Sequence, residues 1–107
     1  MKEIIVTTTN EVPGKTVAQI LSVVKGNTVR ARNIGRDIGA GFKSIIGGEI
    51  KTYTDMIVNA RDEAYNRMIN QAIELGADAV IGARFMTSMI MQGASEMLAY
   101  GTAVKLK

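Results

Sequence analysis

The chain has 107 residues, enough for one domain, with 47% hydrophobic residues and a formal net charge of +3. It contains no cysteine and no histidine. This excludes disulfides, thiolate metal sites and any Ser-His-Asp or Cys-His triad built within the chain, and we expect a single non-enzymatic domain over residues 1–107.

The N-terminal third predicts two strands. The β-branched run EIIVTT (3–8) is typical of a strand, and NEVPG (10–14) is typical of a turn. From Val17 onward apolar residues occupy both alternating faces, which predicts a strand covered on both sides. Gly26-Asn27 either turns the chain as a hairpin or bulges one long strand. Because Val29 and Ala31 continue the inward phase that starts at Val17, we favour the bulge.

A helix is predicted from Ile34 because apolar residues then recur at spacings near four. Asn33 stands at the N-cap position, and Gly47-Gly48 would end this helix. The apolar stripe comprises Ile34, Ile38, Phe42, Ile45 and Ile46.

A second, longer helix is predicted next. Glu63 and Arg67 form a favourable pair four residues apart, and Gly76 fits the position that follows a helix end. The expected buried stripe comprises Tyr53, Ile57, Ala60, Ala64, Met68, Ala72 and Leu75.

The C-terminal third predicts two strands, over DAVIGARFMTSMIM (78–91) and EMLAYGTAVKLK (96–107), with a turn around Gly93. Strict alternation would place Ala79, Ile81, Ala83 and Phe85 on one face of the first of these strands. On the last strand, the face with Met97, Ala99, Gly101 and Ala103 is small enough for close approach by a helix or a neighbouring subunit. The sequence therefore predicts an α+β domain: an antiparallel sheet of three to four strands with two helices on one face, in the order β-β-α-α-β-β.

The segment GAGFKS (39–44) resembles a phosphate-binding loop but departs from it at a decisive position. Phe42 separates Gly41 from Lys43, whereas a P-loop needs its lysine directly after the last glycine. We interpret the segment as a helix whose small residues allow close packing.

Three charged residues on the first predicted helix are candidates for a ligand site. Arg36 and Lys43 could line an anion site beside a subunit interface, together with Asp37. The alternative is that Arg36 and Asp37 form an ion pair near the helix start. Methionines in MTSMIM (86–91) and Met97 could offer thioether ligands to Cu(I), although adaptable packing between subunits is the simpler interpretation. No metal ligand set and no cofactor is assigned.

Charge and hydropathy patterns argue against nucleic-acid and membrane partners. The basic residues from Lys25 to Arg36 are spaced apart and have no aromatic pair that could stack on bases. No apolar run reaches the roughly 18 residues of a membrane helix, and the N-terminus lacks a signal-peptide pattern. We expect a cytoplasmic protein.

Several segments together resemble the YbjQ family, which carries a heavy-metal-binding label. They are NIGRDIGAGFKSIIGG (33–48), Tyr53, ELGADAVIGARF (74–85) and AYGTAVK (99–105). The resemblance implies a dodecin-like subunit in a ring, a homo-pentamer or a stacked decamer. Family members often carry acidic residues on the third strand, where this chain has Arg84 and Met86. We therefore expect poor cation binding there.

Two functions follow as hypotheses. The first is a homo-oligomer with a structural or interaction role. The alternative is a binding module for a small ligand or metal ion at subunit interfaces, as the family label implies.

Overall fold

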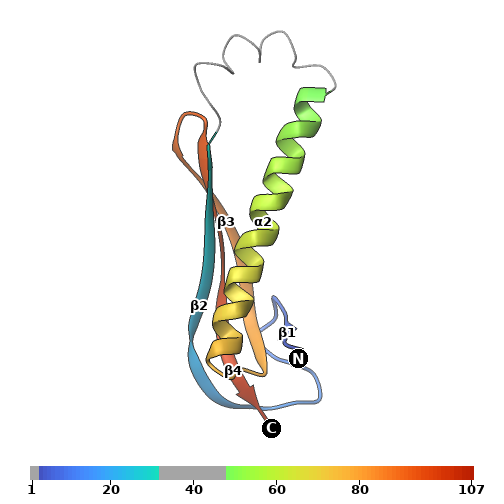
Figure 1. Cartoon of the computed structure of the whole chain (residues 1–107). Helices are drawn as coiled ribbons and strands as arrows, with labels where there is room; N and C mark the ends of the chain where they lie inside the picture. Colours follow the sequence, from blue (N-terminus) through green and yellow to red (C-terminus); the bar gives the residue numbers. More distant parts are fainter. Residues whose placement is uncertain (1–2, 32–47) are drawn as a thin grey trace.

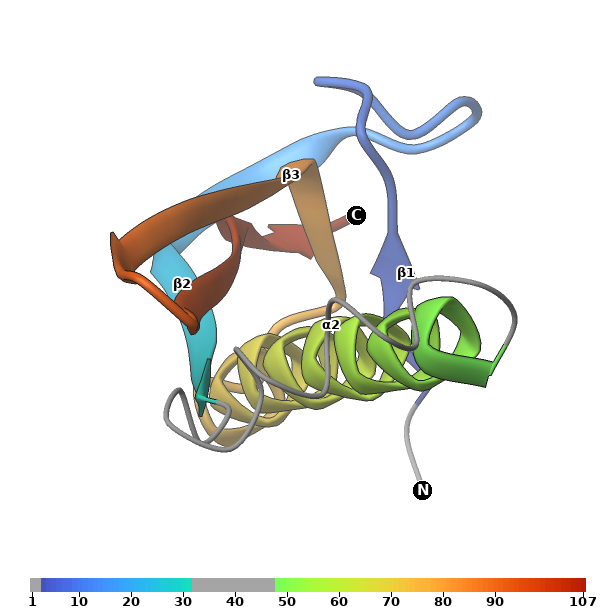
Figure 2. The same ribbon diagram turned by 90° about the horizontal axis from the view of Figure 1, so that it is seen from above.

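The computed structural model describes residues 3–31 and 48–107. The described elements are β1 (Ile5–Val6), β2 (Val17–Ala31), α2 (Gly48–Glu74), β3 (Ala79–Met91) and β4 (Ala94–Leu106), and the strands form one sheet in the order β1-β3-β4-β2. The chain is elongated, measuring 56 × 24 × 22 Å. Helix α2 runs beside the sheet along most of this length (Figure 1), and Figure 2 shows the helix on one side of it. The α+β class is therefore confirmed.

The sheet is mixed, so the prediction of an antiparallel sheet is wrong for one pair. Strand β1 pairs parallel with β3, with Ile5 opposite Ala79. The cause is topological: β2 runs away from the end where β1 lies, α2 returns the chain to that end, and β3 then leaves it in the direction of β1 (Figure 1). The predicted helix over residues 34–46 lies outside the described residues.

Strand β2 is one long strand, but its bulges are not at Gly26-Asn27 as predicted. The register with β4 is continuous there and shifts earlier, between Val17 and Gln19 and between Ile20 and Ser22. Two one-residue shifts restore the original phase, so Val17 and Val23 share the sheet face turned away from α2, and Val17 packs in the second cluster around Val12 and Val104. Val24, Gly26 and Thr28 face α2 and are buried. Val29, expected inside, is 50% exposed.

Gly26 allows the backbone of β2 to touch the backbone of α2. A Cβ at this position would lie 2.3 Å from the Ala64 carbonyl oxygen and 2.5 Å from the Met68 nitrogen. Two residues later, the Thr28 hydroxyl donates a hydrogen bond of 2.9 Å to the Ala60 carbonyl. The sequence did not predict this contact, because Gly26-Asn27 was interpreted as a turn or a bulge.

Helix α2 begins at Gly48, which was expected to end the preceding helix, and so starts before Tyr53, the first residue of its predicted stripe. The centre of its predicted stripe is confirmed, whereas Ile57 and Leu75 at the ends are each 44% exposed. The helix ends at Glu74, and Gly76 follows in the C′ position with a φ of +77°. Gly76 N–H donates to Ile73 O and Ala77 N–H donates to Ala72 O, the Schellman arrangement. The buried stripe residues are Ala60, Ala64, Met68 and Ala72.

Strand β3 does not alternate as predicted, because it bulges around Gly82. The register with β4 shifts between Ile81 and Arg84, and Gly82 has φ +61°. Val80 and Ala83 consequently share the core under α2, while Ile81 packs with a second cluster around Val12 and Val104.

The small-residue face of β4 admits both α2 and this bulge. Ala99 and Ala103 belong to the core under the helix. A Cβ at Gly101 would lie 2.6 Å from Val80 Cγ1, so this glycine accommodates β3. The predicted close approach of a helix to this face is therefore confirmed. The close approach of β3 at Gly101 was not predicted.

Candidate functional site

The most unusual surface feature is an apolar segment of β3, residues 85–91, hereafter the β3 edge segment. It follows the bulge and reaches the turn at Gly93. All of its residues are exposed and none is charged. Its large apolar members and their exposed fractions are Phe85 48%, Met86 50%, Met89 76%, Ile90 54% and Met91 60%.

Two contacts hold the start of this segment. The Phe85 ring stacks on Tyr65 of α2, with ring centroids 6.0 Å apart. The Thr87 hydroxyl lies 2.9 Å from the Met97 sulfur on β4. Towards its turn, the β3–β4 hairpin extends away from the helix (Figure 1). Its methionines are thus an exposed surface of the single subunit, and exposed apolar patches of this kind mark interaction sites.

Arg84 immediately precedes the β3 edge segment and has a structural contact. Its Nη1 atom donates to the Thr8 carbonyl at 2.8 Å and to the Ala83 carbonyl at 2.9 Å. Family members often carry an acidic residue at this position. In this chain, the Arg84 guanidinium occupies it and links β3 to the N-terminal segment.

A second polar feature joins β2 to α2. Glu63 of α2 forms ion pairs with Arg30 of β2 and with Arg67 one turn along the helix. Arg67 also donates to the Asn27 carbonyl at 2.6 Å, and the Asn27 side chain donates to Glu96 Oε2 at 3.1 Å. The Glu63-Arg67 pair was predicted, whereas the partnership with Arg30 depends on tertiary structure.

The hydrogen bond from Arg30 is the main reason why the pKa of Glu63 lies below the ordinary value of 4.5 for a glutamate. The charges of Arg67 and Arg30 lower the pKa further, and desolvation opposes them. Glu63 is therefore ionised at neutral pH, with two guanidinium partners. This arrangement fixes the helix on the strand, and it makes Glu63 itself poorly suited to proton transfer near pH 7.

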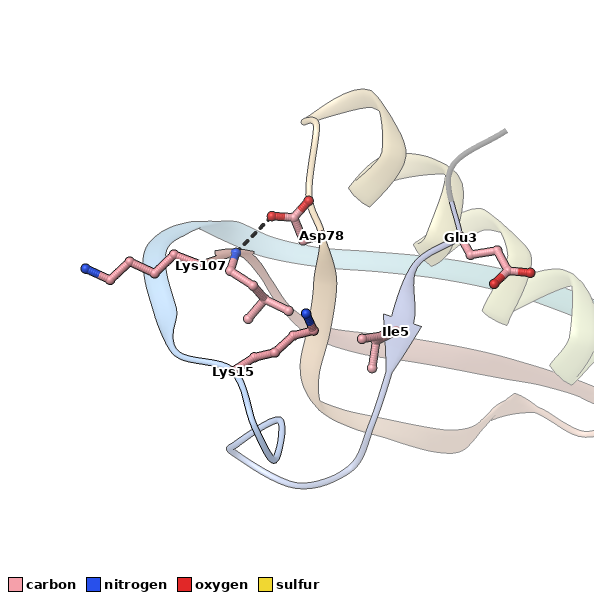
Figure 3. Close-up of a pocket in the computed structure, with 6 residues that line it drawn as sticks. Glu3, Ile5, Lys15, Asp78 and Lys107 are labelled. Carbon is pink, nitrogen blue, oxygen red and sulfur yellow. Dashed lines mark hydrogen bonds between the residues drawn. The ribbon is translucent and has the colours of Figure 1, made fainter.

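A cavity of about 330 Å³ lies at the opposite end of the molecule from the hairpin. Figure 3 shows that its side chains come from several elements, among them the segment before β2 and the start of β3. Asp78 Oδ2 accepts a 2.9 Å hydrogen bond from the Leu106 backbone, so this carboxylate joins β3 to β4. The lining residues are Glu3, Ile5, Lys15, Asp78, Leu106 and Lys107.

The candidate ligand residues Arg36, Asp37 and Lys43 lie outside the described residues, as does GAGFKS. Within residues 3–31 and 48–107, no group of three or more His, Cys, Asp or Glu side chains could hold a metal ion. The described helix is not long and apolar enough to cross a membrane.

Sequence reasoning noticed the methionines of the β3 edge segment and assigned them to packing. The sequence did not reveal that these methionines are exposed, because alternation separates the two faces of a strand but does not show which residues a helix covers. The available signal was the absence of charge over residues 85–91.

Comparison with known proteins identifies the family of this chain. A family profile described as "Putative heavy-metal-binding", that of the YbjQ family, matches residues 4–107. A UPF0145 protein of Methanoculleus marisnigri is 64% identical, with 95% of each chain covered. Another, of Archaeoglobus fulgidus, is 62% identical and covers 99% of this chain and 98% of its own. A third, of Thermotoga maritima, is 58% identical over 96% and 97%.

The fold also has a solved counterpart. The crystal structure of a Pediococcus pentosaceus protein with unknown function, from the DUF74 family, superposes with a TM-score of 0.68. It is 20% identical and covers 97% of this chain and 98% of its own, so the likeness concerns the fold. The profile match over nearly the whole chain and the high identity to UPF0145 proteins show that this chain belongs to the YbjQ family.

Proposed function

We propose that this protein is a non-enzymatic subunit of a homo-oligomer, with a structural or interaction role. The family resemblance implies an oligomer of five subunits, or of ten subunits in two stacked rings. The observation that carries the proposal is the amount of surface that a single subunit leaves exposed.

The chain exposes 7236 Å². A compact folded monomer of 11.5 kDa exposes about 5,800 Å². The excess of about 1,400 Å² exceeds the roughly 800 Å² that one partner contributes to a standard interface. A subunit with this excess gains stability by burying surface against other copies.

The shape of the chain supports the same conclusion. Its radius of gyration is 17.5 Å, whereas a compact domain of 107 residues has about 13 Å. One sheet and one described helix form only two layers, and large apolar side chains remain exposed on both. Association is the usual way in which small thin domains complete their burial.

A role without catalysis is supported by the chain's chemistry. It has neither histidine nor cysteine, the commonest groups for acid-base and nucleophilic work near pH 7. The pKa of the Glu63 carboxyl is lowered by its arginine partners, which moves it away from the value that suits a general base near pH 7.

Native mass spectrometry of the purified protein tests this proposal. We expect a single oligomer of defined subunit number, with five or ten copies as the predicted values. A monomer at every concentration up to about 100 μM would overturn the proposal. Interfaces of standard size have dissociation constants of about 1 μM or lower, so an oligomer should be populated in this range.

The family description favours one alternative, a module that binds a metal ion between subunits. In the described residues, the candidates with suitable soft ligands are Met86, Met89 and Met91, which suit Cu(I). The same mass spectra would show a copper mass per subunit or per interface, and Met89→Leu with Met91→Leu would remove it. Spectra with no added mass after anaerobic Cu(I) titration would reject this alternative.

A further inference from the structure

The two edges of the sheet are covered to different extents. On the β3 side, the N-terminal segment covers the strand only as far as Ala83. Thr7 N–H donates to Val80 O, Gly82 N–H donates to Thr9 O, and Ala83 N–H donates to Thr7 O. From Arg84 to Met91, no described residue forms a backbone pair with this edge; β4 lies on the other side.

The other edge, on β2, is protected by its own chain. The Gln71 side chain accepts a 2.8 Å hydrogen bond from Lys25 N–H, and Arg67 donates to the Asn27 carbonyl at 2.6 Å. Nearer its start, β2 carries the two register shifts that interrupt a regular edge. Capping side chains and bulges are devices by which natural proteins prevent pairing along an edge strand.

In the part of the chain that the structure describes, no capping side chain reaches the β3 edge segment, and its single register shift, between Met89 and Met91, lies at the hairpin end. The segment carries no charge and no proline, and its register with β4 is regular from Arg84 to Met89. A long, regular, apolar edge is a template for another strand, and native proteins keep such an edge covered.

We infer that the β3 edge segment, residues 85–91, is covered by an edge strand of a second copy of this chain. This inference rests on the proposed homo-oligomer and assigns its contact surface. A second copy is favoured because the excess exposed area of about 1,400 Å² suffices for a stable contact, which needs roughly 800 Å² from each partner. The segment also carries no charged side chain, so this contact does not place like charges of two copies against each other within it.

The first test places a lysine in the segment in two separate variants, Met89→Lys at the end of the regular pairing and Ile90→Lys in the register shift beside it. Both side chains are already exposed in the single subunit, so the fold should tolerate the change. Ile73→Lys is the matched control, because Ile73 is 46% exposed on α2.

We expect both β3 variants to dissociate at protein concentrations at least tenfold higher than the wild type, by light scattering after size-exclusion chromatography. Their far-UV circular dichroism should be unchanged, and the control should assemble normally. If both variants keep the wild-type subunit number and dissociation profile, the inference is wrong although the homo-oligomer stands. A wild-type monomer would instead reject the homo-oligomer itself.

Hydrogen exchange measures the backbone pairing directly and is independent of these substitutions. Alternate amides of residues 85–91 face away from β4 in a regular antiparallel strand. We expect these amides to be protected at high protein concentration and to exchange at least tenfold faster on dilution below the dissociation midpoint. Fast exchange of the same amides in the intact oligomer would overturn the inference.

Discussion

At Gly26 the backbones of β2 and α2 approach each other more closely than any side chain permits. A Cβ would lie 2.3 Å from Ala64 O, and neither backbone can move without disturbing the buried residues around it. We therefore expect Gly26→Ala to lower the free energy of unfolding by about 1–3 kcal/mol, as overpacked cores do. Urea denaturation at fixed protein concentration measures this, with the exposed Ser22→Ala on the same strand as the control. Equal midpoints for the two variants would contradict the proposed contact.

Glu63 is the residue through which pH should act on stability. Its pKa is lower in the folded chain than the ordinary 4.5, chiefly because Arg30 donates a hydrogen bond to it. A lowered pKa contributes stability that is fully present above about 4.5, the unfolded value, and is lost as pH falls through the folded pKa.

Glu63→Gln should accordingly lower stability at pH 7 and flatten the fall in stability below about pH 4.5. The measurement is the free energy of unfolding in urea from pH 7 to pH 3. Glu74→Gln, at an exposed position on the same helix, is the control and should retain the wild-type slope. A Glu63→Gln profile parallel to the wild type would show that this carboxyl carries no such linkage.

The end of α2 shows how one glycine determines where an element stops. Gly76 adopts φ +77°, and the nearest atom to a Cβ there would be Lys105 Nζ at 3.8 Å. Gly76→Ala would thus be strained by its backbone conformation and not by crowding. We expect a loss of about 1–2 kcal/mol, the cost of a left-handed residue with a side chain.

A thermal melt measures the effect of Gly76→Ala, and Gly76→Asn provides the comparison, because asparagine tolerates this conformation better. The expected order of melting temperature is wild type, then Gly76→Asn, then Gly76→Ala. Identical melting of all three variants would exclude a stabilising Schellman end.

At the scale of the whole molecule, thin layers and a large exposed surface link stability to assembly. A protein whose folded state is completed by association melts at a temperature that rises with its concentration. We expect the wild-type melting temperature to increase as the protein concentration rises from about 1 to about 100 μM, a range chosen to include micromolar dissociation constants. Ile90→Lys should reduce this dependence. A concentration-independent melt of the wild type would argue that the subunit is stable alone.

Part of the candidate site was accessible from the sequence. The methionines near the end of β3 were recognised as adaptable packing residues, and the absence of charge around them was visible. Which backbone edge lacked a partner was not visible, because it depends on tertiary contacts: the N-terminal segment covers β3 only to Ala83, and Gln71 reaches Lys25 across the fold. The candidates Arg36, Asp37 and Lys43 remain predictions.

The sequence by itself determined the elements whose signals are local. The stripe through Ala64 and Met68, the glycine after the helix and the long final strands follow from periodicity and backbone chemistry. Only the tertiary structure decided the phase of β2 and β3 and the parallel pairing of β1. A bulge moves every later side chain to the other face, and its position depends on the opposite strand, as the bulge around Gly82 facing β4 demonstrates. Likewise, Gly26 is required only because α2 lies against β2.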